Sequence, residues 1–286
     1  MKKINILLAT LLCAAFCPAF AGAPVVEIWK GVKMPGTATD QPEKRGGDPQ
    51  KDNHGYQFVS VPTLEVFPAE TGKPSGALII CPGGGYGHLA YGKEGTQVAK
   101  FLSSNGITCF VLKYRIPQNR DGAFQDAQRA VRLVRKNAGR WNVDPAKIGI
   151  MGFSAGGHLS ARTSTNGSEE SYQPLDAADK VSPRPDFTVL IYPAYIGDNN
   201  TYELKPEIRV DEHTPRAFIV QTQDDTSYIG SSIGYYLALK KLNIPADLHL
   251  YAAGGHGYGL LEKSKPVSSW GGLLVDWLKF NKFADQ

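Results

Sequence analysis

Residues 148–157 have the sequence Ile-Gly-Ile-Met-Gly-Phe-Ser-Ala-Gly-Gly. An apolar run typical of a buried strand leads into Gly-x-Ser-x-Gly at 152–156, and a helix is predicted from Ala155 onward. A serine on so tight a turn needs flanking glycines, because side chains there would collide with neighbouring backbone. An ordinary Gly-rich turn is the alternative, but the predicted strand and helix favour Ser154 as a nucleophile.

Short apolar runs alternate with helical periods along the rest of the chain, which predicts a mostly parallel sheet covered by helices on both faces. In the clearest helix, 122–138, apolar residues recur every three or four positions, and Arg129 and Arg132 fall on the other faces. Residues 57–67 alternate and contain Pro62, which predicts edge strands with a bend. The remaining expected strands are 77–81, 107–113, 148–153, 187–192, 217–221 and 246–251, and the remaining expected helices are 94–105, 231–242 and 268–280.

A second motif, Pro82-Gly83-Gly84-Gly85-Tyr86, directly follows the expected strand 77–81. Glycines let the backbone approach a substrate closely, and a tetrahedral intermediate needs N–H donors aimed at its oxyanion. Gly84 and Gly85, with Ala155 after the nucleophile, are therefore the predicted oxyanion-hole donors. A flexible loop or a phosphate-binding loop is the alternative. No Lys-Ser/Thr follows the glycines and no acid lies at the usual ribose distance, which argues against nucleotide binding.

His256 is the predicted base among six histidines, since it lies in a Gly-rich loop, 254–259, after the last expected strand. The acid should follow the preceding strand, and Asp224 and Asp225 both do. Only one of the two carboxylates can accept from the imidazole and fix its tautomer. The chain order serine, aspartate, histidine is that of α/β-hydrolases and differs from the order in other serine-hydrolase folds.

The N-terminus carries the pattern of a secretory signal. Lys2 and Lys3 precede an apolar run at 4–16, and small residues flank Phe20 at 19–21. We therefore expect a signal peptide at 1–21, removed on export to the periplasm or beyond the cell. The rest, 22–286, is expected to be a single domain with an irregular N-terminal arm at 22–55.

The composition argues against nucleic acids, membranes, metals and organic cofactors as ligands. Removal of the leader takes away two lysines and no acid, so the formal charge falls from +4 to +2, and no run of like charge stands out. We expect no nucleic-acid partner and, after cleavage, no membrane partner. No pair of histidines or cysteines has ligand spacing, so neither a metal nor an organic cofactor is implied. Cys81 and Cys109 are expected to be buried free thiols, because their positions on neighbouring parallel strands would be offset by several residues.

Several stretches together resemble a known family. These are ICPGGGYGHLAYGKEG (80–95), VLKYR (111–115), the long run from Asp126 to Ala161, RPDFTVLIYP (184–193) and LHLYAAGGHGYGL (248–260). They are similar to secreted bacterial acetyl-xylan esterases, also labelled xylanase B-like, from the acetyl- and feruloyl-esterase branch of the α/β-hydrolases. The resemblance begins near Val59 and implies the α/β-hydrolase fold with an eight-stranded sheet. In that family the acid lies in a segment x-T-x-x-D-T, which selects Asp225 over Asp224.

The resemblance implies deacylation of an esterified carbohydrate, with acetyl or feruloyl groups leaving plant polysaccharide fragments through an acyl-enzyme. One alternative is a peptidase of the prolyl-oligopeptidase kind, although the chain lacks the several hundred residues of a gating propeller. The others are a general small-ester carboxylesterase and a catalytically inactive fold that serves as a binding module.

The segment 193–215 is shorter than the corresponding one in the relatives, so a small lid or none is expected. Tyr195 and Tyr202 lie in it, and Tyr86 is expected across the cleft beside the oxyanion loop. The three tyrosines are candidate stacking surfaces for a sugar face. The alternative is that they only pack the rim.

Overall fold

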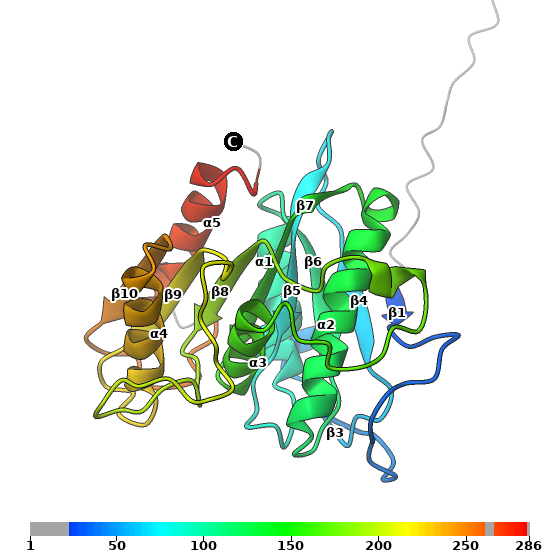
Figure 1. The fold of residues 1–286 in the computed structure, drawn as a ribbon, viewed down its shortest axis with the longest axis horizontal. Coiled ribbons are helices and arrows are strands. Elements are labelled where there is room, and N and C mark those ends of the chain that lie inside the picture. The colour runs from blue at the N-terminus through cyan, green and yellow to red at the C-terminus, as the bar shows by residue number, and fades with distance from the viewer. Residues whose placement is uncertain (1–22, 261–265, 285–286) are drawn as a thin grey trace, which may run out of the picture.

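The computed structural model describes residues 23–260 and 266–284, so the predicted signal peptide at 1–21 lies outside the described residues. An eight-stranded sheet runs through the centre of the molecule (Figure 1). In spatial order its strands are β1 (Val25–Glu27), β4 (Thr63–Phe67), β6 (Thr108–Lys113), β5 (Ser75–Cys81), β7 (Val143–Phe153), β8 (Phe187–Ile191), β9 (Ala217–Thr222) and β10 (Ala246–Tyr251).

The pairing is parallel from β6 to β10, while β1 and β4 pair antiparallel with their neighbours. This confirms the predicted mostly parallel, eight-stranded sheet. The central strands β5, β8 and β9 are buried along their whole length, which explains their continuous apolar sequences.

The prediction of edge strands over 57–67 was wrong. β4 lies in the interior of the sheet, between β1 and β6. Pro62 is compatible with this position because it comes just before the strand, where its missing N–H does not interrupt the ladder. Gly55–Gln57 forms β3, which pairs antiparallel with β2 (Lys44–Gly46) in a separate two-stranded sheet within the N-terminal arm.

Helices cover both faces of the sheet, as predicted. Figure 1 shows α2, α3 and α4 on one face and α1 and α5 on the other. A π-helical turn, η2 (Gly92–Thr96), precedes the first α-helix. The α-helices are α1 (Gln97–Ser103), α2 (Arg120–Lys136), α3 (Ala155–Thr165), α4 (Ile229–Lys241) and α5 (Trp270–Phe280).

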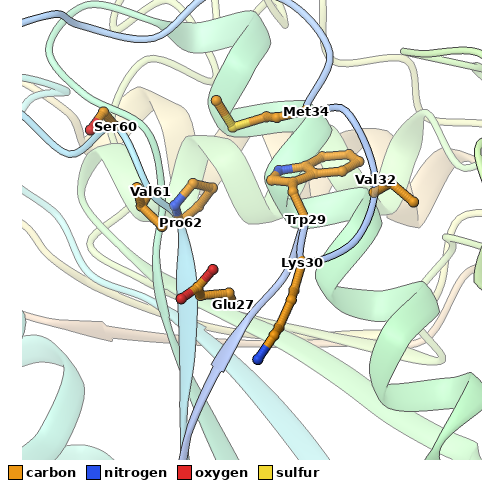
Figure 2. Close-up of a pocket in the computed structure, with 8 residues that line it drawn as sticks. All are labelled: Glu27, Trp29, Lys30, Val32, Met34, Ser60, Val61 and Pro62. Carbon is orange, nitrogen blue, oxygen red and sulfur yellow. The ribbon is translucent and has the colours of Figure 1, made fainter.

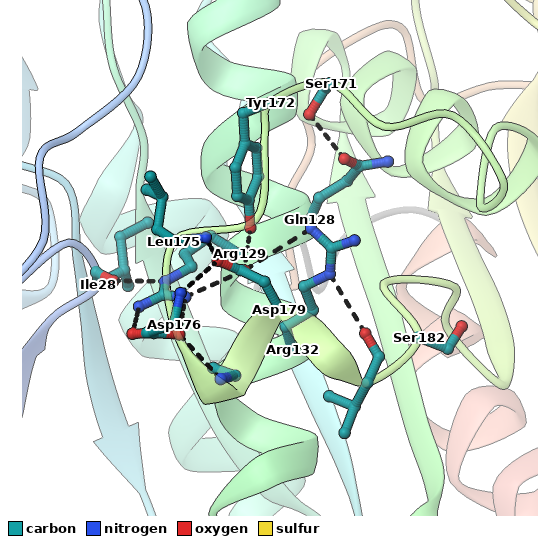
Figure 3. Close-up of polar contacts among 12 residues, drawn as sticks. Ile28, Gln128, Arg129, Arg132, Ser171, Tyr172, Leu175, Asp176, Asp179 and Ser182 are labelled. Carbon is teal, nitrogen blue, oxygen red and sulfur yellow. Dashed lines mark hydrogen bonds and ion pairs between the residues drawn. The ribbon is translucent and has the colours of Figure 1, made fainter.

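Buried ion pairs fasten α2 to the segments that cover it (Figure 3). Arg129 is 1% exposed, and its guanidinium donates to Asp176 and Asp179 over 2.6–3.0 Å. Its Nε donates to the carbonyl oxygen of Ile28, at the base of the N-terminal arm. Arg132, also buried, donates to the carbonyl of Val181. These arginines are therefore not on a solvated face of the helix, because the chain at 171–182 folds over them.

A surface hollow of about 190 Å³ lies between the loop after β1 and the loop before β4 (Figure 2). Trp29 lines one side of it, and Val61 and Pro62 line the opposite side. β1 is the edge strand, and three strands separate it from β7, which leads to Ser154. The hollow is thus remote from the predicted nucleophile.

Cys81 and Cys109 are buried and free, as expected. Cys109 pairs in register with Leu78, three residues from Cys81, so the two thiols are offset along their strands. Burial raises the pKa of the Cys81 thiol to about 12, which keeps it protonated. Within the described part of the chain, no helix combines the length and the apolar content that crossing a bilayer requires.

Candidate active site

Ser154 occupies a strained turn between β7 and α3. Its φ of 51° and ψ of −118° are rare for a residue with a side chain. A Cβ at Gly152 would lie 2.0 Å from the carbonyl oxygen of Gly156, and one at Gly156 would lie 2.0 Å from that of Cys81. The turn therefore admits only glycine at these two positions, and it leaves the serine partly exposed at the end of the strand.

The structure brings Ser154, His256 and Asp225 together at the carboxyl edge of the sheet. His256 Nε2 lies 2.8 Å from Ser154 Oγ, and its Nδ1 lies 2.7 Å from Asp225 Oδ2. The aspartate follows β9 and its side chain is 3% exposed, whereas the imidazole, after β10, is 31% exposed. A carboxylate at Nδ1 favours the tautomer with the proton there, so Nε2 is left to accept the proton of the serine hydroxyl.

Asp224 has a different partner from Asp225. Its carboxylate accepts hydrogen bonds from the backbone N–H groups of Gly255, at 2.8 Å, and Gly254, at 3.0 Å. Together these bonds hold the pKa of Asp224 below its usual range, and the bond from Gly255 contributes most. The two adjacent carboxylates therefore have separate roles. Asp225 contacts the imidazole, and Asp224 anchors the loop that carries His256.

The loop after β5 presents free backbone donors. Gly84 and Gly85 have φ values of 129° and 63°, and a Cβ at Gly84 would lie 2.1 Å from the carbonyl oxygen of His88. Among the described residues, no acceptor contacts the N–H groups of Gly84, Gly85 or Ala155. The three predicted oxyanion-hole donors are thus available to a ligand, whereas the N–H of Gly83 is already bonded to a side chain.

That side chain belongs to Glu94, which sequence reasoning missed. It is 5% exposed; one carboxylate oxygen accepts from Gly83 N–H at 2.7 Å and the other from the Tyr192 hydroxyl at 2.9 Å. The Tyr192 oxygen in turn accepts from Gly259 N–H at 3.1 Å. Burial raises the pKa of Glu94, and the bonds from Gly83 and Tyr192 oppose that shift. Glu94 thereby joins the oxyanion loop, which carries Gly84 and Gly85, to the histidine loop, which carries His256.

The prediction that Tyr86 offers a stacking surface was wrong. Its side chain is 1% exposed, and its hydroxyl lies 2.7 Å from Nδ1 of His158, on the nucleophile helix α3. Burial lowers the pKa of His158 to about 4, and the positive charge of Arg120 contributes to this shift. A neutral His158 can accept from Tyr86 at Nδ1 while its Nε2 faces Glu207, 3.3 Å away. Tyr86 thus fixes the oxyanion loop to α3.

Tyr195 and Tyr202 take different positions. Tyr195 packs edge-on against Tyr228, with ring centres 5.4 Å apart, and the Tyr228 ring lies 5.0 Å from that of His256. Tyr195 therefore borders the site. Tyr202 is 40% exposed, and its backbone oxygen faces Gly234 of α4. The contacts found within the described residues do not link its side chain to the triad.

The segment 193–215 forms no helix or strand of its own and contains only turns and a bridge between Gly197 and Leu204. It therefore makes a rim and not an enclosing lid. Across the described parts of the chain, no group of three or more histidine, cysteine or acidic side chains is arranged to hold a metal ion.

The strand order, the strained serine turn and the chain order of serine, aspartate and histidine define an α/β-hydrolase. A protein-family model described as BD-FAE matches residues 65–190. The crystal structure of an acetyl ester-xyloside bifunctional hydrolase from Caldicellulosiruptor lactoaceticus has a TM-score of 0.75 to this chain. The two sequences are 30% identical, and the match covers 92% of this chain and 97% of that one. The chain belongs to the acetyl-xylan esterase-like family of α/β-hydrolases, which confirms the resemblance seen in the sequence.

Two curated relatives are longer proteins. An acetylxylan esterase from Xylanibacter ruminicola is 33% identical over 233 residues, which cover 72% of this chain and 46% of the relative. An endo-1,4-beta-xylanase B from Butyrivibrio fibrisolvens is 28% identical over 250 residues, 78% of this chain and 39% of the relative. The chain therefore spans less than half the length of these relatives.

The adjacent aspartates provide a matched pair of variants. We predict that Asp225→Asn lowers kcat for ester hydrolysis about 10²- to 10⁴-fold, because the amide favours the wrong imidazole tautomer. Asp224→Asn should cost less than about tenfold, because the remaining oxygen still accepts from the loop. Steady-state kinetics on p-nitrophenyl acetate measures both, and the opposite ranking would refute the assignment of Asp225.

Glu94→Gln tests the link between the two loops. The amide keeps one acceptor oxygen, so Gly83 and Tyr192 cannot both be satisfied, and an unpaired buried donor costs about 1–3 kcal/mol. We expect urea unfolding to show this loss, and kcat to fall about 10- to 100-fold as the oxyanion donors shift. Glu70→Gln, on an exposed residue, is the control. Wild-type kcat in Glu94→Gln would show that the link does not serve the site.

Proposed function

We propose that this protein is a secreted serine esterase that removes acetyl groups, and also feruloyl groups, from plant polysaccharide fragments. The observation that carries the proposal is the position of His256, within hydrogen-bond distance of both Ser154 and Asp225. The proposal is also supported by the N–H groups of Gly84, Gly85 and Ala155, which have no acceptor among the described residues. This combination supplies the nucleophile, the base and the oxyanion stabilisation that acyl transfer requires.

In the first half-reaction, Ser154 Oγ attacks the ester carbonyl carbon while its proton passes to His256 Nε2. The N–H groups of Gly84, Gly85 and Ala155 donate to the oxygen as it becomes negative. Asp225, nearly buried beside Nδ1, stabilises the imidazolium that forms. The tetrahedral intermediate then collapses, and the sugar oxygen leaves with the proton from Nε2.

In the second half-reaction, water replaces the sugar alcohol. His256 Nε2 takes a proton from the water as its oxygen attacks the acyl-enzyme carbonyl. Collapse of the second intermediate returns the proton to Ser154 Oγ and releases the acid. Because the serine is partly exposed and 193–215 forms only a rim, water and a bulky sugar alcohol can both reach the acyl group.

The carbohydrate part of the proposal is supported by the relatives, whose names include an acetylxylan esterase and an acetyl ester-xyloside hydrolase. The proposal of export rests on the basic and apolar pattern of residues 1–21, which lie outside the described part of the chain.

The experiment is to measure acetate release from acetylated xylo-oligosaccharides together with kcat/KM for p-nitrophenyl esters from acetate to decanoate. We predict release of acetate and a preference for short acyl chains, because the rim cannot enclose a long one. Ser154→Ala should lower kcat by about 10⁴- to 10⁶-fold and leave the fold intact. A preference for long chains without action on the oligosaccharide would indicate a lipase-like enzyme.

A further inference from the structure

The N-terminal arm is attached directly to the oxyanion loop. Tyr56 of β3 and Leu89 exchange two backbone hydrogen bonds of 3.1 and 2.9 Å, and Gly92 N–H donates to the carbonyl oxygen of His54 at 2.7 Å. The fit is close, since a Cβ at Gly55 would lie 2.6 Å from the carbonyl oxygen of Leu89. The β2–β3 hairpin is therefore held at a fixed position beside the loop that carries Gly84 and Gly85.

A cavity of about 340 Å³ lies between this hairpin and the oxyanion loop. On the loop side it is lined by His88, whose backbone N–H donates to the carbonyl oxygen of Gly84 at 3.1 Å. One wall of the cavity is thus in contact with a predicted oxyanion donor. Its full lining is Lys44, Arg45, Gly46, Gly55, Tyr56, Gln57 and His88.

Two exposed cations line the cavity without forming a direct ion pair to any described residue. Lys44 and Arg45 are exposed, and within the described residues no carboxylate comes within 4.0 Å of either charged group. The neighbouring acid, Glu43, is instead paired with Lys113 at 2.8 Å. Lys44 Nζ lies 5.4 Å from the ring centre of Phe58, so an aromatic neighbour helps to position this cation.

We infer that this cavity binds the carboxylate of a uronic acid residue on the carbohydrate chain whose ester is cleaved at Ser154. A guanidinium and an ammonium group without a carboxylate partner match that ligand, and Gln57 adds an amide for sugar hydroxyls. A volume of about 340 Å³ falls in the range of small-molecule sites. The inference rests on the proposed function, and it gives the N-terminal arm a role in selecting the substrate.

Binding is the first test, with unesterified xylo-oligosaccharides that carry or lack one glucuronic acid group. By isothermal titration calorimetry in 20 mM NaCl, the acidic oligosaccharide should bind the wild-type protein roughly tenfold more tightly than the neutral one. The difference should shrink at about 500 mM NaCl, where exposed charges are screened.

Two variants show whether the cavity causes this difference in affinity. The double variant Lys44→Gln/Arg45→Gln should lose the difference, whereas Lys51→Gln, on an exposed lysine next to Asp48, should retain it. Equal binding of the two oligosaccharides by the wild-type protein would overturn the inference.

Acetate release from the acetylated forms of the same oligosaccharides separates the two proposals. A kcat/KM ratio that favours the acidic substrate, and falls to one in the double variant, would support both. Release at equal kcat/KM together with equal binding would overturn the cavity assignment and leave the esterase proposal standing. A binding preference without any acetate release would support the cavity assignment and contradict the proposed function.

Discussion

The catalytic geometry is centred on the hydrogen bond between His256 Nε2 and Ser154 Oγ. Its two residues are 102 positions apart, and only the parallel arrangement of β7, β9 and β10 brings the strand ends to one edge of the sheet. The serine turn is strained, and glycines at 152 and 156 make it possible. Asp224 then fixes the histidine loop, and Asp225 fixes the imidazole itself.

The loops around the triad form one connected polar network. Glu94 bonds to the oxyanion loop at Gly83 and, through Tyr192, to the histidine loop at Gly259. Tyr86 and His158 connect the oxyanion loop to the nucleophile helix. Because such buried groups are costly to leave unpaired, the network holds the nucleophile, the base and the oxyanion donors in a fixed relation before substrate binds.

The strands, the helices and the residues that meet at the site could be predicted because they follow local rules. Continuous apolar runs indicated the buried strands, and the glycine motifs indicated places where the backbone approaches a neighbour closely. Predictions failed where a distant segment decides the environment. Tyr86 was expected to line the cleft as a stacking surface, yet His158 on α3 supplies a buried partner for its hydroxyl. Arg129 was assigned to a polar helix face, but Asp176 and Asp179 cover it. No sequence pattern indicated the link made by Glu94, because its partners are a backbone amide and a tyrosine 98 residues away.

Covalent labelling tests whether Ser154 is a nucleophile activated by His256. The wild-type protein would be treated with a fluorophosphonate, and the adduct located by mass spectrometry of its peptides. We predict one adduct per chain, on Ser154, with a labelling rate that parallels the loss of activity on p-nitrophenyl acetate. Retention of esterase activity with Ser154 unmodified, or loss of activity with the adduct on a different serine, would show that Ser154 is not the activated nucleophile.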